Sequence, residues 1–353
     1  MAPNTEKNII QDEDNSIDKY VVYPDTKYPP LEPFEHKDPG HLADPKKASL
    51  YDSATSIKDV TPHIGTEIKG IQLSQLTEQQ KNDLALLAAE RGVVFFRDQD
   101  INKEQLIELG SYYGPLHIHN SSGQVPNHPE LLSVFFDEKN QRIIKRLESK
   151  TAAEGIHSDI TFEHQPAGLS ILKIDVLPPV GGDTIWSSAY TAYDRLSKPL
   201  QQFLETLSAT HYADQLIGVA KEFGHTIHRE YPTDTVHPVI RTHPVTGWKG
   251  LFVQPGFTRS IVGLKKKESD TLLQLLYDHI ASGYDFQVRF KWEEGSVAVW
   301  DNRSTFHAAI FDYFEQGRRF GYRVTPRAER PYFDPNSKSR KEDLEERRKA
   351  NNL

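Results

Sequence analysis

The stretch Ser296-Val297-Ala298-Val299-Trp300-Asp301-Asn302-Arg303-Ser304-Thr305-Phe306-His307 joins an apolar segment to a polar turn and a histidine. Its first five residues are rich in β-branched and aromatic side chains, which is typical of a buried strand. A second informative stretch, His157-Ser158-Asp159, lies far earlier in the chain. Residues two apart in a strand project from the same face, so we expect His157 and Asp159 to point the same way.

Two imidazoles and one carboxylate on one side of an Fe(II) ion leave positions open for a co-substrate and dioxygen. We therefore predict that His157, Asp159 and His307 ligate iron(II), with His307 on a neighbouring strand or at its end. Other His-x-acid triplets also fit this pattern, and an isolated one is more often a solvated histidine. The other triplets are His36-Lys37-Asp38, His128-Pro129-Glu130 and His228-Arg229-Glu230. Only His157 is followed by an apolar run and a Pro-x-Gly turn.

Strand patterns dominate the chain after about residue 131. We expect strands at 132–136, 169–174, 250–253, 286–290, 296–300 and 319–325. We expect helices at 78–91, 103–113, 189–207 and 267–281. Thr77 and Asn102 are the expected N-caps of the first two helices, and Gly92 ends the first. This order predicts a mainly β protein with helical insertions, built on a double-stranded β-helix (jelly roll) core.

Composition changes near both ends of the chain. Residues 1–55 are rich in Pro, Asp, Lys and Asn with scattered tyrosines, so we expect an extended or disordered N-terminal arm that wraps the domain or a partner. Regular structure is expected from about Val60, within an oxygenase domain at 56–333. Residues 334–353 are mostly charged, and we expect a C-terminal tail that is a solvated helix or disordered.

The overall composition excludes several classes of protein. The 353 residues carry a net charge of -8, which argues against nucleic acid as a partner. The sequence contains no cysteine, so disulfides, thiolate-bound zinc and iron–sulfur clusters are excluded. No apolar run is long enough to cross a membrane, and Met1 to Lys7 shows no secretory signal. We therefore expect a cytoplasmic protein without membrane contact.

Two arginines shortly after His307 form a second candidate site. In Gly317-Arg318-Arg319-Phe320-Gly321-Tyr322-Arg323, a strand would place Arg319 and Arg323 on one face and Arg318 on the other. Two guanidiniums inside a barrel are costly unless anions neutralise them. A carboxylate or a sulfonate would do so. The alternative is a basic edge strand that faces water.

Together these blocks resemble the taurine dioxygenase family of iron(II)- and 2-oxoglutarate-dependent oxygenases, in a fungal-type, sulfonate dioxygenase-like form. The resemblance runs from about residue 60 to 333. It is carried by Val94-Phe95-Phe96-Arg97-Asp98-Gln99, Gly114-Pro115-Leu116-His117-Ile118-His119, His157-Ser158-Asp159-Ile160-Thr161-Phe162, Gly181-Gly182-Asp183-Thr184, His237-Pro238-Val239-Ile240-Arg241-Thr242-His243-Pro244, Phe286-Gln287-Val288-Arg289 and Trp300-Asp301-Asn302-Arg303.

The resemblance implies roles for residues beyond the iron ligands. Thr184 and Arg319 would hold the distal carboxylate of the co-substrate 2-oxoglutarate. Arg323 and His119 would bind the anionic head of the substrate. Phe257 and Ile160 would line its cavity. Family members usually have one residue fewer between the distal histidine and the arginine pair, so Arg318 stays an alternative to Arg319.

Each implied residue also fits a structural role. The Gly181–Thr184 block fits a simple turn. His119 fits a hydrogen-bonded core histidine, and Phe257 and Trp300 fit core packing.

The implied reaction is the hydroxylation of a small organosulfonate next to sulfur, with release of sulfite and an aldehyde. Where the taurine-specific member has polar residues near the substrate amine, this chain reads Ser122, Ala153 and Leu216-Ile217. These residues suggest a substrate without that amine, or a bulkier sulfonate. The alternatives are the same chemistry on an amino acid, an aryloxy acid or an alkyl sulfate ester, and a non-catalytic jelly-roll binding protein. Relatives often form homodimers or homotetramers.

Overall fold

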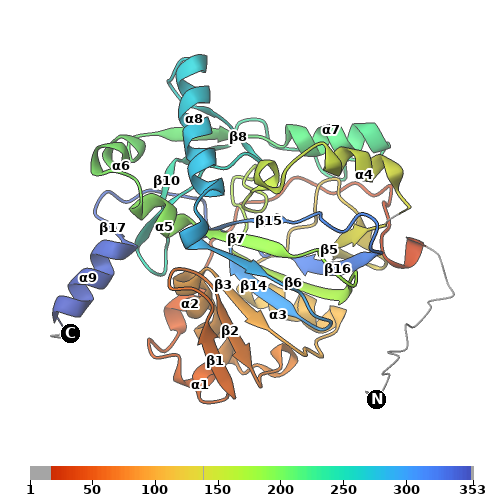
Figure 1. Ribbon diagram of the computed structural model, residues 1–353, viewed down its shortest axis with the longest axis horizontal. Helices are drawn as coiled ribbons and strands as arrows, with labels where there is room; N and C mark the ends of the chain where they lie inside the picture. The colour runs from red at the N-terminus through yellow and green to blue at the C-terminus, as the bar shows by residue number, and fades with distance from the viewer. Residues whose placement is uncertain (1–16, 138, 351–353) are drawn as a thin grey trace, which may run out of the picture.

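The computed structural model describes residues 17–137 and 139–350, and its centre is an eight-stranded sheet. A smaller sheet of three strands lies over this large sheet (Figure 1). The strands of the large sheet are, in spatial order, β1 (Ser56–Asp59), β2 (Thr66–Lys69), β3 (Val93–Phe96), β14 (Val297–Asp301), β6 (Leu169–Val176), β16 (Arg319–Val324), β5 (His128–Phe136) and β4 (Gln124–Val125). Those of the small sheet are β13 (Gln287–Phe290), β7 (Thr184–Ser188) and β15 (Thr305–Ala309).

Aromatic side chains fill the space between the two sheets. Phe95 of β3 stacks on Phe290 of β13 with ring centroids 4.0 Å apart. Trp186 of β7 meets the edge of Phe95 at 5.4 Å and of Trp300 at 5.8 Å. All four rings are at most 5% exposed, so the sheets pack face to face through a dry aromatic layer.

Helices cover the opposite face of the large sheet, and their predicted ends are confirmed. In α2 (Glu78–Arg91), Thr77 and Gln80 form a reciprocal capping box, and Gly92 follows the last turn. In α3 (Lys103–Tyr113), Asn102 forms the same box with the third helical residue. Both helices contribute buried leucines to one cluster with β3, β6, β14 and β16.

The expected helix at 189–207 is instead two helices, α5 (Ala189–Asp194) and α6 (Lys198–Leu204). Pro199 lies in the first turn of α6, where its fixed φ favours a helix start rather than a helix interior. The predicted helix at 267–281 is confirmed as α8 (Lys266–Ala281).

Two further helices, α4 (Gln141–Glu148) and α7 (Asp214–Phe223), are absent from the sequence prediction. They lie side by side at the upper right of Figure 1, where Arg146 of α4 pairs with Glu222 of α7 at 2.8 Å.

The remaining elements form two peripheral sheets and short helices. One peripheral sheet contains β10 (Ile240–Thr242), β11 (Trp248–Leu251) and β17 (Lys338–Ser339), and the other contains β12 (Thr258–Ile261), β8 (Ser208–His211) and β9 (Val236–Pro238). The short helices are α1 (Ala48–Tyr51) and the 3-10 helices η1 (Ile17–Lys19), η2 (Pro39–Leu42), η3 (Leu73–Gln75), η4 (Ala152–Gly155) and η5 (Tyr284–Phe286).

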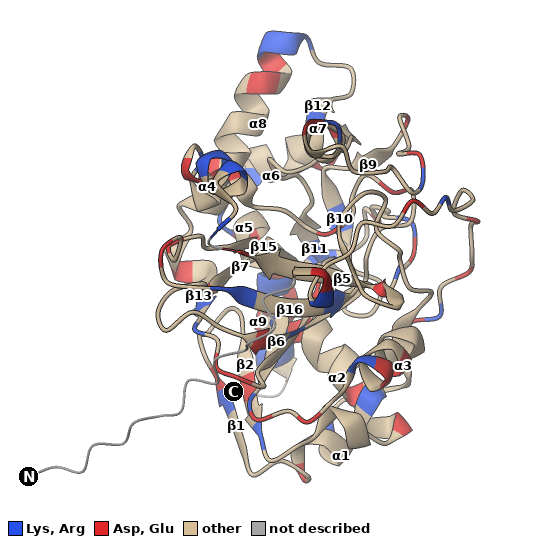
Figure 2. Ribbon diagram, turned by 90° about the vertical axis from the view of Figure 1, so that its right-hand side faces the viewer, with Lys and Arg blue, Asp and Glu red and all other residues tan. Residues whose placement is uncertain are grey.

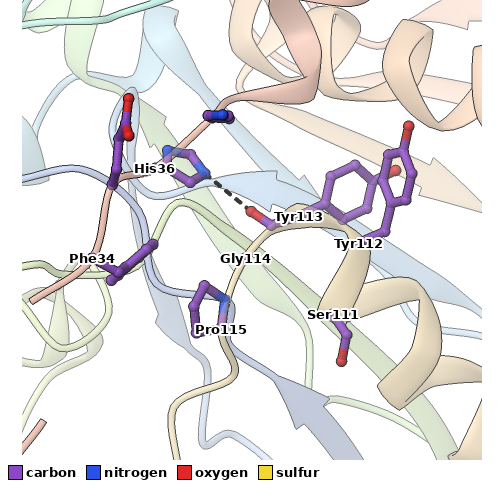
Figure 3. Close-up of a pocket in the computed structure, with 9 residues that line it drawn as sticks. Phe34, His36, Ser111, Tyr112, Tyr113, Gly114 and Pro115 are labelled. Atoms are coloured by element: carbon purple, nitrogen blue, oxygen red, sulfur yellow. Dashed lines mark hydrogen bonds between the residues drawn. The ribbon is translucent and has the colours of Figure 1, made fainter. Parts of the chain in front are cut away.

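The described part of the N-terminal arm wraps the body of the protein. Val22 forms an isolated antiparallel bridge with Gln124 of β4, with both N–H···O distances at 2.9 Å. Further along, a ring nitrogen of His36 lies 3.1 Å from the carbonyl oxygen of Tyr113, the contact drawn in Figure 3. Ordered structure therefore begins well before Val60, because the arm satisfies its polar groups on the domain. Residues 1–16 of the predicted arm lie outside the described residues.

A buried cluster of charges ties the arm to the turn after β14. Arg303 is 2% exposed, donates to Asp301 at 2.7 Å and also contacts Asp38 of the arm. Burial opposes ionisation of Asp38, but Arg303 outweighs it and lowers the pKa of that carboxyl. The ion pair is thus charged at neutral pH, and it holds the arm in place from inside the protein.

The C-terminal tail forms the helix α9 (Arg340–Ala350), which packs on the body at one end. Trp248 donates through Nε1 to Asp343 at 2.8 Å, and the guanidinium of Arg340 lies over its ring. Residues 351–353 of the predicted tail lie outside the described residues. Among those described, no helix has the length and apolar character of a membrane span. Figure 2 shows acidic and basic residues interspersed over the outer helices and loops.

We predict that Asp38→Asn lowers the free energy of unfolding by about 2 kcal/mol at pH 7, because Arg303 loses a buried charged partner. Urea unfolding measures the change, and Asp52→Asn, at an exposed position, is the control. Folding lowers the pKa of Asp38, so its ion pair contributes fully to the free energy of unfolding when the pH is above the pKa of Asp38 in the unfolded chain. This contribution is lost as the pH falls from that value through the lower pKa of the folded protein. Equal stability of the two variants would contradict this role.

Candidate metal centre and substrate cavity

The three predicted iron ligands lie together between the two sheets. His157 and His307 form an antiparallel bridge with N–H···O distances of 2.9 and 2.7 Å, which brings their ring centroids within 4.2 Å. One ligand atom from each of His157, Asp159 and His307 lies within 4.8 Å of the others. This His-Asp-His group is the metal site that the sequence predicts.

The local structure of the first ligand pair differs from the prediction. His157 makes only the single bridge with His307, and Asp159 lies in a turn rather than in a regular strand. The next residue, Ile160, has φ 47°, which is unusual for a β-branched side chain. The strand predicted for His157–Asp159 is therefore wrong, and Asp159 reaches the histidines from a turn.

Hydrogen bonds orient His157 and Asp159. The Nδ1 of His157 lies 2.8 Å from the carbonyl oxygen of Gly155, which leaves Nε2 free for a metal. Asp159 accepts through Oδ2 from Ser170 at 2.8 Å, and its N–H donates to Asn302 at 3.0 Å. Its Oδ1 lies 3.5 Å from Nε2 of His157. The carboxylate thus offers its other oxygen toward the imidazoles.

The charge states of Asp159 and His307 suit a divalent ion. Burial opposes ionisation of Asp159, but Arg323, with Nη1 at 2.8 Å from Oδ1, and His307 hold the pKa of that carboxyl well below its usual value. Burial, and then the neighbouring His157, hold the pKa of His307 well below its usual value. At neutral pH the site therefore combines a carboxylate with a neutral imidazole, as metal ligation requires.

A cavity of about 470 Å³ opens beside the metal centre, and its size is that of a small-molecule site. All the site residues expected from the sequence line this one cavity. They are His119, His157, Asp159, Ile160, Thr184, Phe257, His307, Arg319 and Arg323.

Arg318 lies outside the lining of the cavity, with Nε 3.8 Å from Asp137. The strand β16 therefore places Arg319 and Arg323 in the cavity and Arg318 on the other face, as the alternation predicts.

Arg319 has the environment of an anion-binding residue. It is 3% exposed, and its Nε donates to the carbonyl oxygen of Gly182 at 3.1 Å. Its buried Nη2 has no hydrogen-bond partner, and no carboxylate of the described residues forms a salt bridge with it. The hydroxyl oxygen of Thr184 accepts from Trp292 at 3.0 Å, so its proton can be donated into the cavity. This pair fits a carboxylate of 2-oxoglutarate.

A second group of donors lies around Arg323. Its Nε is buried without a hydrogen-bond partner. His119 accepts through Nδ1 from the N–H of Ser122 at 3.3 Å, so its Nε2 carries the proton. Burial, then His117 and Arg323, hold the pKa of His119 well below its usual value, so this donor is neutral. Arg323 and His119 together present N–H groups to an anion.

The cavity also contains residues that the sequence prediction missed. Helix α7 contributes Val219, Ala220 and Phe223, which together with Leu216, already named from the sequence, form a helical stripe with a spacing of three and four residues that could have been found. Three positions correspond to residues near the substrate amine in the taurine-specific family member. Of these, Ser122 and Leu216 line the cavity, whereas Ala153 is exposed.

The facing sheets and the His-Asp-His centre define an iron-dependent oxygenase, and comparison with known proteins identifies the family. The model of the family described as "Taurine catabolism dioxygenase TauD, TfdA family" matches residues 56–325. The chain belongs to this family, whose enzymes are α-ketoglutarate-dependent dioxygenases that use Fe(II) and 2-oxoglutarate. A non-catalytic binding protein is therefore set aside.

Three relatives illustrate the relationship. An α-ketoglutarate-dependent sulfonate dioxygenase of Saccharomyces cerevisiae is 40% identical over 318 residues, covering 88% of this chain and 77% of the relative. An alkylsulfatase of Acinetobacter baylyi is 33% identical, covering 74% of this chain and 82% of the relative. The crystal structure of a taurine dioxygenase from Burkholderia xenovorans has a TM-score of 0.65 and 34% identity, covering 81% of this chain and 94% of that one.

We predict that Asp159→Ala abolishes the binding of iron(II), because the site loses the only carboxylate among the three ligands. Anaerobic calorimetric titration with iron(II) measures the loss, and circular dichroism checks that the variant is folded. His164→Ala is the control, because its imidazole is half exposed and pairs with Asp234. Metal affinity within twofold of the parent in Asp159→Ala would show that the site lies elsewhere.

Proposed function

We propose that this enzyme oxidises an organosulfonate at the carbon next to sulfur. The observation that carries the proposal is the placement of Arg319 and Arg323 on one face of β16, in the same cavity as the metal centre. Two anionic groups, one from the co-substrate and one from the substrate, would then be held on two sides of one metal. The sulfonate dioxygenase of Saccharomyces cerevisiae, 40% identical to this chain, supports the choice of head group.

In this proposal His157, Asp159 and His307 hold iron(II), and Thr184 with Arg319 binds the distal carboxylate of 2-oxoglutarate. Together with dioxygen, the iron and 2-oxoglutarate supply the oxidising chemistry. The residues of the chain bind, orient and exclude water, because a bound substrate reacts only from a near-attack position. Arg323 and His119 set that position by fixing the sulfonate.

The atoms of the reaction balance with these components. One oxygen atom of dioxygen is inserted into a C–H bond of the carbon next to sulfur and forms a hydroxyl group, while the other ends in succinate as 2-oxoglutarate loses carbon dioxide. The hydroxylated carbon then loses sulfite, which leaves with the electron pair of the carbon–sulfur bond. The hydroxyl proton is released and an aldehyde remains.

The charges in the cavity favour a substrate without an amine. Asp159 is the only acidic residue among the described residues that line it. As a metal ligand, this carboxylate is not available to pair with an ammonium group. An amino acid would bury its charged amine without a partner, so this alternative is disfavoured.

We also propose that the large and small sheets form the double-stranded β-helix expected from the sequence. The supporting observation is the bridge between His157 and His307, which joins the loop before β6 to β15 across the two sheets. The metal would then lie at the open end of the sandwich.

An alkyl sulfate ester is the second candidate substrate, because the alkylsulfatase of Acinetobacter baylyi is 33% identical to this chain. Sulfate and sulfonate groups are both tetrahedral oxyanions, so Arg323 and His119 would bind either. Oxidation of the carbon bonded to the ester oxygen would release sulfate rather than sulfite. The released anion therefore separates the two proposals.

We predict that Arg319→Ala raises the KM for 2-oxoglutarate on the order of 100-fold, because a buried charged hydrogen bond is lost. Arg318→Ala, on the opposite strand face, is the matched control and should change this KM less than threefold. Succinate formation over a range of 2-oxoglutarate concentrations measures both values. The reverse ranking would assign the co-substrate to Arg318.

We predict that Arg323→Ala weakens the binding of a sulfonate at least tenfold, because the anion loses its guanidinium partner. Sulfite release from alkanesulfonates, together with sulfate release from alkyl sulfates, is measured in the parent and the variant. Uncoupled succinate formation in the absence of substrate is the internal control for an intact metal site. Succinate formation without sulfite from any sulfonate would contradict the sulfonate proposal.

A further inference from the structure

The N-terminal arm reaches the substrate cavity, although the family model begins only at residue 56. A row of paired residues on neighbouring strands joins the arm to Arg323 in the large sheet. Arg323 of β16 pairs with Leu132 of β5, and Leu132 pairs with Gln124 of β4. Gln124 in turn forms the bridge with Val22 of the arm. Val22 therefore extends this row of the sheet by one residue, and the next residue along the arm is Tyr23.

Tyr23 forms part of the wall of the cavity. Its ring stacks on the imidazole of His225 with centroids 3.6 Å apart and an interplanar angle of 19°. His225 stacks in turn on Phe223, the last residue of α7, at 5.8 Å. All three rings line the cavity, and Tyr23 keeps 44% of its surface exposed.

The position of Tyr23 is fixed by close contacts on both sides. A Cβ atom at Gly123 would lie 3.1 Å from the Tyr23 ring and 2.2 Å from a methyl group of Val21, so only glycine allows the arm to approach this closely. Beyond Tyr23, Thr226 donates to Asp25 at 2.6 Å, which ties the arm to the segment after α7. The tyrosine is thus held at the cavity by contacts on either side of it.

Helix α7 forms an apolar wall of the cavity with Leu216, Val219 and Ala220, and β5 adds Leu132 to the lining. Leu216 also packs against the cluster that contains Ile160 and Phe257, the residues expected to contact the substrate. Such a wall favours an uncharged hydrocarbon tail, since a polar tail would lose its hydration there.

The row of paired residues gives the length of this surface. Three steps between neighbouring strands, at ~4.8 Å each, separate Val22 from Arg323, so the two backbone positions are roughly 14 Å apart. Arg323 and Tyr23, the neighbour of Val22, both line the cavity. A sulfonate of two carbons bound at Arg323 would end before the tyrosine, whereas a tail of several more carbons would reach it.

We propose that Tyr23 is a substrate-binding residue that selects anions with a long apolar or aromatic tail. The head group binds at Arg323, and the tail lies along α7 and ends against the stacked rings of Tyr23, His225 and Phe223. The arm thereby completes the substrate site of the domain. This inference rests on the proposed function, since the head group is the proposed sulfonate.

The experiment compares Tyr23→Ala with Tyr28→Ala in the full-length enzyme. Tyr28 is the matched control, because it lies on the same arm, meets the edge of His228 and lines a different cavity. Sulfite release is measured with 1-octanesulfonate and with ethanesulfonate, and kcat/KM is determined for both. Tyr23→Phe retains the ring and tests whether the hydroxyl group matters.

We expect the ratio of kcat/KM for octanesulfonate to that for ethanesulfonate to fall at least tenfold in Tyr23→Ala. The change should appear mainly in KM, while the ratio stays within twofold of the parent in Tyr28→Ala and Tyr23→Phe. An unchanged ratio in Tyr23→Ala, or an equal fall in Tyr28→Ala, would overturn the inference. If the parent enzyme prefers ethanesulfonate, the inference also fails, whereas absence of sulfite from both sulfonates would contradict the proposed function itself.

Discussion

The pair of backbone hydrogen bonds between His157 and His307 is the constraint on which the site depends. These bonds bring two distant parts of the chain together and fix two imidazoles beside Asp159. A metal site needs its ligand atoms positioned before the ion arrives, because ordering loose side chains costs free energy. The backbone, rather than the side chains alone, provides this order here. Ile160, directly after Asp159, has a positive φ within the turn that contains this ligand.

The cavity contains two buried arginines, Arg319 and Arg323, with different electrostatic surroundings. Arg323 compensates the charge of the ligand carboxylate, with its Nη1 2.8 Å from Asp159 Oδ1. A divalent ion would take over that compensation, which would leave the guanidinium for the substrate. Arg319 forms no salt bridge among the described residues, so a bound anion would balance its buried charge. The two arginines share one strand face, but it is Arg323 that pairs with the ligand carboxylate.

The arm shows how a segment outside the family match can belong to the site. Its polar groups are satisfied on the domain, its Asp38 is buried against Arg303, and its Tyr23 lines the cavity. The arm supplies none of the three metal ligands, so it lines the cavity without taking part in the metal centre.

The sequence alone determined the metal ligands, the arginine face of β16 and the capped helices α2 and α3, because each follows from local spacing and side-chain chemistry. Tertiary structure decided what local patterns do not contain. The turn at Asp159 follows a bridge between His157 and the distant His307. The apolar stripe of α7 lines the cavity, so its burial depends on the folded domain. The position of Tyr23 required the arm to be paired with β4. Residues far apart in sequence meet through sheet pairing and burial, and those contacts are fixed only when the whole chain has folded.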